Sequence, residues 1–175
     1  MTTITISGTP GSGKSTVAEI LEEKLGLKYI YSGMIFRDLA KEHKMSLEEF
    51  GKFCEENSKV DKELDNRQLE ILKKGNVILE GRMAGWLAHL NNIPALKVSI
   101  DANLETRAKR IVKREKGSVE DRIREILERE RSEAIRYKNY YNIILRDKSI
   151  YDLIIDSGDK TPEEIADIII KKING

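Results

Sequence analysis

The chain has 175 residues, which is enough for one substantial hydrophobic core and too few for two full domains. Its 31 lysines and arginines balance 30 acidic residues, so the net charge of +1 provides no global field that would attract nucleic acid or an acidic membrane. We therefore expect any anion-binding site to be local. A single cysteine, Cys54, excludes an internal disulfide and suits a reducing compartment.

The sequence contains no basic N-terminal region followed by an apolar run, and no apolar stretch near the ~20 residues that span a bilayer. We therefore expect a cytoplasmic protein that neither enters a membrane nor binds nucleic acid. Because no apolar stripe beyond the core-facing ones indicates a partner surface, we expect a monomer.

Short β-branched or apolar runs alternate with helical patterns along the chain. The runs are residues 3–7, 28–31, 76–80, 96–100 and 153–156, each of about strand length. This alternation predicts an α/β fold, a five-stranded parallel sheet flanked by helices on both faces. In such a sheet, ligands bind at the carboxyl ends of the strands. We expect residues 1–175 to form one domain.

Residues 8–15 follow the first strand and match G-x-x-x-x-G-K-[ST] at every fixed position. A helical apolar pattern follows them, so the motif has the strand, loop and helix that a phosphate-binding loop requires. Its glycines allow a tight turn whose N–H groups point at phosphate oxygens. Lys14 is expected to reach the β- and γ-phosphates, and Ser15 to bind Mg²⁺ through its hydroxyl. The residues expected to bind the nucleotide are Gly8, Thr9, Pro10, Gly11, Ser12, Gly13, Lys14, Ser15 and Thr16, together with Arg107 after the fourth strand.

Two further polar segments follow the second and third strands, at the same edge of the predicted sheet. Each combines glycine with an arginine, whose planar guanidinium suits a pair of phosphate oxygens. We therefore expect a second anion, the phosphoryl acceptor, to be bound here and to face the nucleotide. The residues expected to bind the acceptor are Ser32, Gly33, Arg37, Gly81 and Arg82.

Two longer segments interrupt the alternation of strands and helices. Residues 32–75 are predicted to form two or three helices, with Ser46 as a cap, and we call them the acceptor insert. Residues 115–147 are rich in arginine and are predicted to form a mobile lid and the helix that follows it, which we call the lid segment. The last helix should begin after Thr161, because Pro162 suits the first helical position and Glu164 completes a capping box.

A phosphate-binding loop alone does not distinguish a switch GTPase, a motor ATPase and a small-molecule kinase. Large ATPase machines need more chain than 175 residues. A GTPase should carry the guanine-reading motif N-K-x-D, and this motif is missing from the sequence. The acceptor arginines favour a kinase that uses ATP.

Together, the phosphate-binding loop, S-G-x-x-x-R after the second strand and V-I-L-E-G-R-x-x-G after the third resemble the nucleoside monophosphate kinases. Within that P-loop NTPase group, the chain is most similar to the short archaeal-type cytidylate kinases, over essentially its whole length. In the lid segment, Arg129, Glu133 and Arg136 repeat the spacing R-x-x-x-[DE]-x-x-R of those enzymes. Residues at i, i+4 and i+7 share one face of a helix, which gives the spacing a physical meaning.

The resemblance implies roles for several residues. Arg129 and Arg136 would be catalytic, arriving on lid closure to stabilise charge on the transferring phosphoryl group. Glu80 stands where these kinases often carry Asp and would order water around Mg²⁺; the alternative is a buried partner of Lys14 or Arg82. Independently of the resemblance, Asp61 and Asp65, with Arg67, lie in the acceptor insert and are expected to contact the acceptor base; the alternative is a solvated helix face.

Other families match less well. Adenylate kinases share S-G-x-x-x-R, but their D-G-[FY]-P-R segment is replaced here by residues 80–85. Shikimate-type kinases need D-x-[DE] after the second strand, where this chain has Tyr31-Ser32-Gly33. Bacterial cytidylate kinases have polar residues at the positions of Met83 and Trp86 and carry a large insert that is missing here.

The expected reaction is Mg²⁺-dependent transfer of the γ-phosphoryl group of ATP to CMP, and also to dCMP, in pyrimidine nucleotide metabolism. The alternatives are an adenylate kinase or another small-molecule kinase of the same fold. A regulatory module that binds nucleotide and hydrolyses ATP slowly is an alternative from a different class, but it would have no need of acceptor arginines.

Overall fold

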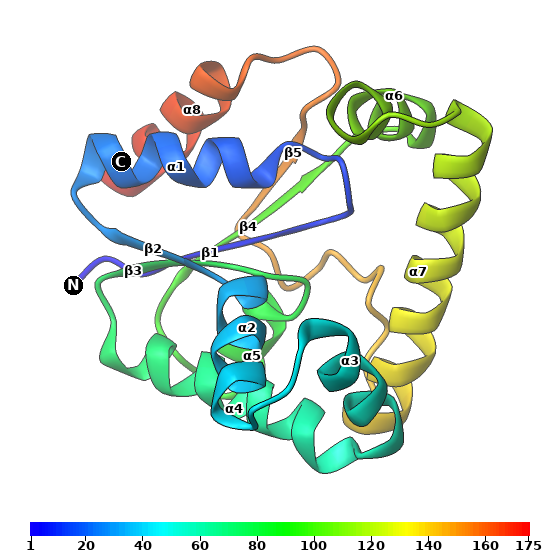
Figure 1. Ribbon diagram of the computed structural model, residues 1–175. Coiled ribbons are helices and arrows are strands. Elements are labelled where there is room, and N and C mark those ends of the chain that lie inside the picture. The colour runs from blue at the N-terminus through cyan, green and yellow to red at the C-terminus, as the bar shows by residue number, and fades with distance from the viewer.

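The computed structural model describes residues 1–54 and 56–175 and contains a five-stranded sheet in the order β2-β3-β1-β4-β5 (Figure 1). All neighbouring strands pair in parallel. The strands are β1 (Ile4–Gly8), β2 (Lys28–Tyr31), β3 (Val77–Glu80), β4 (Leu96–Asp101) and β5 (Leu153–Asp156). They lie within one residue of the runs that the sequence predicts, so the predicted α/β fold with a parallel sheet is confirmed.

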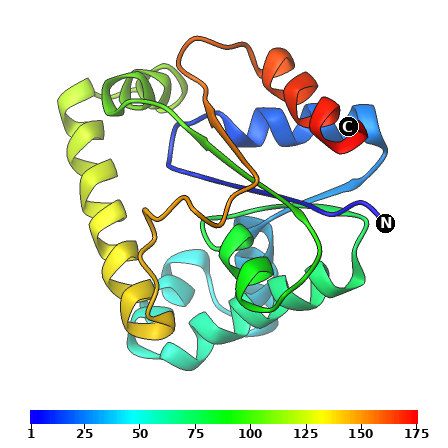
Figure 2. The same ribbon diagram turned by 180° about the vertical axis from the view of Figure 1, so that it is seen from behind.

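Helices cover both faces of this sheet (Figures 1 and 2). One face is covered by α1 and α8, and the other by α2, α4 and α5. Successive side chains of a strand point to opposite faces, so Ile78 joins the core under α1 and α8, whereas Leu79 joins the core on the other side. The helices are α1 (Lys14–Leu25), α2 (Ser32–Glu42), α3 (Leu47–Glu56), α4 (Ser58–Lys74), α5 (Ala84–Leu90), α6 (Leu104–Glu115), α7 (Val119–Tyr141) and α8 (Pro162–Asn174).

The acceptor insert consists of the three helices α2, α3 and α4. Ser46 caps α3 through a capping box with Glu49, as its sequence context predicts. Inside the insert, the rings of Phe36 and Phe50 lie 4.9 Å apart between centroids, and Phe50 is fully buried. This aromatic contact packs α2 against α3, so the insert has an apolar interior of its own.

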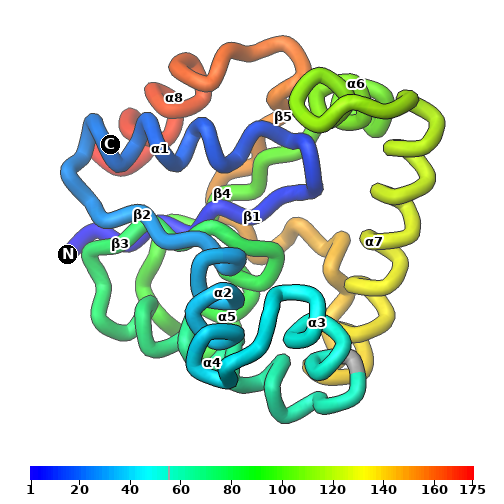
Figure 3. The backbone as a smooth tube through the Cα atoms, viewed as in Figure 1, coloured from blue at the N-terminus to red at the C-terminus, as the bar shows by residue number. Residues whose placement is uncertain are grey.

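The lid segment is dominated by α7, a helix of 23 residues. Figures 1 and 2 show this helix standing beside the sheet and running from α6 at one end to the insert helices at the other. Figure 3 traces both chain termini to the opposite side of the molecule, so α7 lies on the side to which the carboxyl ends of the strands point. The helix therefore spans the edge at which ligands of a parallel sheet bind.

The last helix, α8, begins as predicted, with Thr161 as its N-cap, a capping box to Glu164 and a proline in its first turn. Among the residues that the structure describes, no helix combines the length and apolarity needed to cross a membrane.

Candidate active site

The phosphate-binding loop joins β1 to α1 and has the backbone that its glycines permit. Gly11 and Gly13 have φ angles of 78° and 87°, in the left-handed region that favours glycine. At Gly8, an added Cβ would lie 2.1 Å from the carbonyl oxygen of Ile100 on the neighbouring strand β4. The loop therefore turns tightly between two strands before α1 begins at Lys14, and the helix N-terminus faces the loop, as phosphate binding requires.

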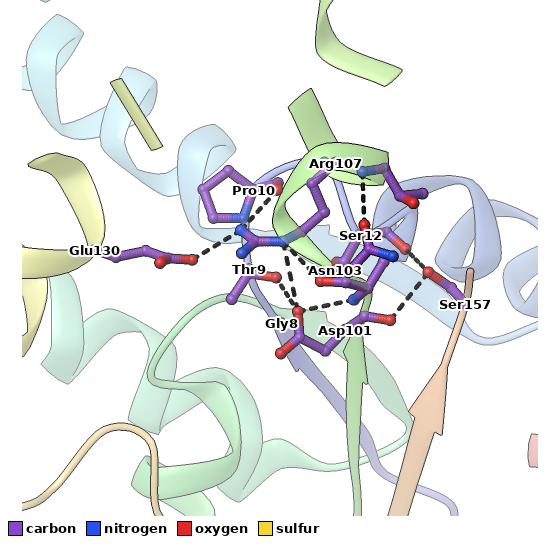
Figure 4. Close-up of polar contacts among 12 residues, drawn as sticks. Gly8, Thr9, Pro10, Ser12, Asp101, Asn103, Arg107, Glu130 and Ser157 are labelled. Carbon is purple, nitrogen blue, oxygen red and sulfur yellow. Dashed lines mark hydrogen bonds and ion pairs between the residues drawn. The ribbon is translucent and has the colours of Figure 1, made fainter. Parts of the chain in front are cut away.

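Side chains from distant elements hold the carbonyl groups of this loop (Figure 4). Arg107 donates to the Pro10 carbonyl oxygen at 3.4 Å, and the Ser157 hydroxyl donates to the Ser12 carbonyl oxygen at 2.7 Å. Arg110 donates to the Gly11 carbonyl oxygen at 3.3 Å. With three successive carbonyls bound from outside, the loop is braced in one conformation.

Arg107 lies against the phosphate-binding loop, where the sequence predicts that it binds ATP. Its side chain is buried, with the residue 6% exposed, and its Nε donates to the Ala102 carbonyl oxygen at 2.9 Å. Its Nη1 donates to Glu130 of α7 at 2.8 Å, in addition to its contact with Pro10. The guanidinium is thus used to connect the phosphate-binding loop with the lid segment (Figure 4).

Lys14 and Ser15 converge on one carboxylate at the end of β3. The Ser15 hydroxyl donates to Oε2 of Glu80 at 3.0 Å, and the ammonium of Lys14 lies 3.9 Å from Oε1. The hydroxyl of Tyr29, on β2, donates to the same Oε2. Burial lowers the pKa of Lys14 to about 8, and the charge of Glu80 opposes that shift. Burial and the bond to Glu80 raise the pKa of Tyr29.

These groups fit the requirements of a magnesium ion that is bound mainly through nucleotide phosphates. Mg²⁺ prefers oxygen ligands and usually takes one or two from protein, with the remainder from phosphate and water. The Ser15 hydroxyl and the Glu80 carboxylate supply such oxygens beside the phosphate-binding loop. Within the described part of the chain, no cluster of three or more His, Cys, Asp or Glu side chains could hold a metal by itself.

Glu133 of α7 bridges two of the predicted phosphate-binding arginines. It accepts from Nε of Arg82 at 2.5 Å and from Nε of Arg129 at 3.0 Å, and it is only 7% exposed. Arg82 also donates to the carbonyl oxygen of Gly8 at 2.9 Å. Both arginines lie close enough to Lys14 for their charges to lower its pKa. The structure therefore gathers three cations around the start of the phosphate-binding loop.

Arg37 lies on α2 with its guanidinium exposed. It donates to the hydroxyl of Tyr31 at 2.9 Å, and its Cζ lies 5.9 Å from the centroid of that ring. Tyr31 thus orients Arg37 without neutralising its charge. Ser32 and Gly33 are the first two residues of α2 and come before Arg37 in the same helix.

Arg136 faces the acceptor insert in this structure, and its action on the transferring phosphoryl group after lid closure stays a prediction. Its guanidinium lies 5.5 Å from the centroid of the Tyr137 ring. Burial acts to lower the pKa of Arg136, but Tyr137 and the charge of Asp61 outweigh it, so the pKa is raised. The Arg136 Nε is buried and has no hydrogen-bond partner among the described residues. In this conformation, Arg129 pairs with Glu133, and Arg136 lies over the ring of Tyr137.

The structure keeps Asp61 and Asp65 close enough for their charges to interact, and it pairs Arg67 elsewhere. Asp65 is 7% exposed and accepts from the Tyr141 hydroxyl, and burial raises the pKa of its carboxyl to about 6. Burial also raises the pKa of Asp61, against the opposing charge of Arg136. Arg67 instead pairs with Glu42 of α2 at 2.6 Å.

Sequence reasoning missed several polar residues at the site. Tyr29 and Tyr31 lie on a strand whose apolar pattern carries no signal for these contacts. Gln68 of α4 is 2% exposed and stands in a highly charged stretch, so nothing in the sequence marks it as buried. Glu130 is one of many acidic residues on α7.

The sheet order, the phosphate-binding loop and the facing arginines define a P-loop kinase fold. Solved structures with this fold are similar over nearly the whole chain. Shikimate kinase from Bacteroides thetaiotaomicron superimposes with a TM-score of 0.66 at 14% identity, covering 99% of this chain and 99% of that chain. Shikimate kinase from Aquifex aeolicus gives a TM-score of 0.62 at 20% identity, with coverage of 99% and 96%. At these identities the likeness concerns the fold alone.

The sequence comparisons show the family. Residues 3–159 match the model of the cytidylate kinase-like family. A cytidylate kinase from Methanocaldococcus jannaschii is 46% identical over 98% of this chain and 97% of its own length. A cytidylate kinase from Pyrococcus horikoshii is 46% identical over 95% of this chain and 85% of its own length. The chain therefore belongs to the cytidylate kinase-like family.

Proposed function

We propose that the protein transfers the γ-phosphoryl group of ATP to CMP, and also to dCMP, giving ADP and the corresponding diphosphate. The observation that carries the proposal is the gathering of Lys14, Arg82 and Arg129 at the phosphate-binding loop, where two phosphates can face each other. Membership of the cytidylate kinase-like family supports the choice of acceptor. We place the reaction in pyrimidine nucleotide metabolism in the cytoplasm, catalysed by a monomer.

The donor half of the site binds ATP through the phosphate-binding loop. The loop amides and Lys14 hold the β- and γ-phosphates, and the bracing of the Pro10 and Ser12 carbonyls keeps the loop in shape. Mg²⁺, when bound, neutralises charge on the β- and γ-phosphates. Ser15 would hold this ion, and Glu80 would order its water molecules.

The acceptor half binds the phosphate of CMP through Arg37 and Arg82. An oxygen of that phosphate attacks the γ-phosphorus, and the bond to the oxygen that bridges the β- and γ-phosphates breaks as ADP leaves. The acceptor needs no general base, because its second pKa of about 6 leaves it mostly dianionic at neutral pH. Catalysis therefore comes from alignment and from stabilisation of negative charge.

The arginines held by Glu133 must be released to phosphate during this cycle. Arg82 and Arg129 now share the Glu133 carboxylate, which is a monoanion. A dianionic phosphate competes favourably for both guanidiniums, because charge-assisted and bidentate bonds to phosphate are strong. We infer that Arg129 moves onto the transferring phosphoryl group as α7 closes, and that closure excludes water, which would otherwise accept the phosphoryl group.

A panel of acceptors tests this function. CMP, dCMP, UMP, AMP and shikimate are each incubated with ATP and Mg²⁺, and the formation of ADP and of the phosphorylated acceptor is followed by chromatography. We expect CMP and dCMP to be the best acceptors, and Lys14→Ala to abolish most of the turnover. A strong preference for AMP would show that the acceptor assignment is wrong while the kinase chemistry holds. ADP formation at the same rate without any acceptor would instead indicate a slow ATPase.

A further inference from the structure

The side-chain oxygen of Gln68 is a buried hydrogen-bond acceptor without a donor. Gln68 lies on α4 of the acceptor insert and is almost completely buried. Its Oε1 has no hydrogen-bond partner among the residues that the structure describes. Buried polar side-chain atoms in native proteins are paired in the large majority of cases, so an unpaired one needs an explanation. A ligand that donates a hydrogen bond would provide it.

The unpaired oxygen lies where the two acceptor-binding loops meet. A Cβ added at Gly81 would be 3.1 Å from Gln68 Oε1 and 3.2 Å from the Ser32 hydroxyl. Gly81 immediately precedes Arg82, and Ser32 begins the segment that carries Arg37. The acceptor oxygen of Gln68 is therefore next to both segments that we assign to the acceptor nucleotide, and only glycine at position 81 allows this close approach.

The neighbours of Gln68 determine which end of its amide faces this position. Nε2 of Gln68 donates to Oδ1 of Asp65 at 3.4 Å, and the Tyr141 hydroxyl donates to Oδ2 of the same carboxylate. An ionised carboxylate accepts hydrogen bonds and cannot donate them. Asp65 therefore attracts the NH₂ group of the amide, and the carbonyl oxygen must point the other way, toward the loops.

We propose that Gln68 selects the base of the acceptor nucleotide by accepting a hydrogen bond from its exocyclic amino group, with Asp65 and Tyr141 as positioning residues. Cytosine carries an amino group at C4, where uracil carries a carbonyl oxygen. With uracil, two acceptors would face each other, and neither would have a donor. The inference rests on the proposed function, since it requires a pyrimidine monophosphate in the acceptor half of the site. It makes Gln68 the residue that separates amino from keto pyrimidines.

The test compares kcat/KM for CMP and for UMP in the wild type and in two variants. Gln68→Leu removes the acceptor oxygen while keeping most of the volume. We expect kcat/KM for CMP to fall by roughly 10- to 100-fold, and kcat/KM for UMP to change by no more than about threefold. Asp65→Asn places an amide beside Gln68 that can donate to Oε1, so Gln68 can turn its NH₂ group toward the base. In this variant, kcat/KM for CMP divided by kcat/KM for UMP should be lower than in the wild type.

The test does not depend on how much of a variant is folded, because it uses the ratio of kcat/KM for CMP to kcat/KM for UMP. Loss of folded protein lowers both rates equally and leaves the ratio unchanged. Asn66→Ala, an exposed change on the same helix, is the matched control and should keep the wild-type ratio. An unchanged ratio in both Gln68→Leu and Asp65→Asn would overturn the role of Gln68, because a buried water molecule would then satisfy Oε1.

The wild-type measurement separates this inference from the proposed function. If the wild type phosphorylates CMP well but the variants keep its preference, only the role of Gln68 is wrong. If the wild type prefers UMP with Gln68 intact, the role of Gln68 is also wrong. If the wild type phosphorylates no nucleoside monophosphate, the proposed function fails, and the role of Gln68 fails with it.

Discussion

Replacement of Asp65 by asparagine should stabilise the protein at alkaline pH. Asp65 is 7% exposed, and burial raises the pKa of its carboxyl from 3.8 to about 6. The other groups that act on it are the Tyr141 hydroxyl and Arg136, which favour its charged form, and Asp61, which disfavours it. The folded state therefore resists ionisation of Asp65, and the wild type is expected to lose stability as pH rises from about 4 through 6.

The magnitude follows from the shift of about two pKa units. Each unit corresponds to about 1.4 kcal/mol, so the ionised carboxylate costs the folded state about 3 kcal/mol at pH 8 and less than about 1 kcal/mol at pH 4. Asp65→Asn removes this cost. The variant should exceed the wild type in free energy of unfolding by up to about 3 kcal/mol at pH 8, and the difference should shrink toward pH 4.

Urea denaturation followed by circular dichroism at pH 4, 6 and 8 measures these differences. Tyr141→Phe is the opposite perturbation, because it removes a hydrogen bond that favours the charged carboxylate. Its deficit relative to the wild type should therefore be largest at pH 8. The same difference in unfolding free energy between Asp65→Asn and the wild type at pH 4 and pH 8 would show that burial does not raise the pKa of Asp65.

Three further predictions concern the donor and acceptor halves of the site. Arg107→Ala should lower stability by about 3–5 kcal/mol in urea denaturation, because it leaves the largely buried side chain of Glu130 without its partner. The same variant should raise the KM for ATP, and adding Glu130→Gln should restore part of the stability. Arg82→Lys should raise the KM for CMP at least about tenfold, because lysine cannot reproduce the two-pronged geometry of the guanidinium. An equal rise in the KM for ATP would contradict the assignment of Arg82 to the acceptor side. Gly8→Ala should abolish activity and lower the melting temperature, because the new methyl group would meet the Ile100 carbonyl oxygen at 2.1 Å; an active and equally stable variant would contradict this loop geometry.

Some parts of the fold and site depend on interactions that are local in the chain, and these are readable from the sequence. The capping boxes at Ser46 and Thr161 join residues three apart, and both are present. Likewise, the phosphate-binding loop is specified by eight consecutive residues that follow a strand and precede a helix. The pair of Arg129 and Glu133 joins neighbours on one face of α7.

Other parts depend on which segments the fold brings together, and the sequence did not predict them. Glu133 also binds Arg82, 51 residues away, and this second contact joins α7 to the loop after β3 through a buried carboxylate. Arg107 is predicted to bind ATP, but the sequence did not predict that it also braces the loop through Pro10, 97 residues away. Gln68 looked like one polar residue in a charged helix, and only the approach of Gly81 and Ser32 makes it a buried acceptor.

The sequence by itself determined the parallel sheet, the phosphate-binding loop and the presence of arginines after the second and third strands. Strand patterns, turns and caps act over a few residues, so their information is contained in short stretches of chain. Only the tertiary structure decided which polar groups are buried, which charges are already paired and which acceptor is left without a donor. Burial and pairing are properties of space shared by distant segments, and a single sequence does not record those distances.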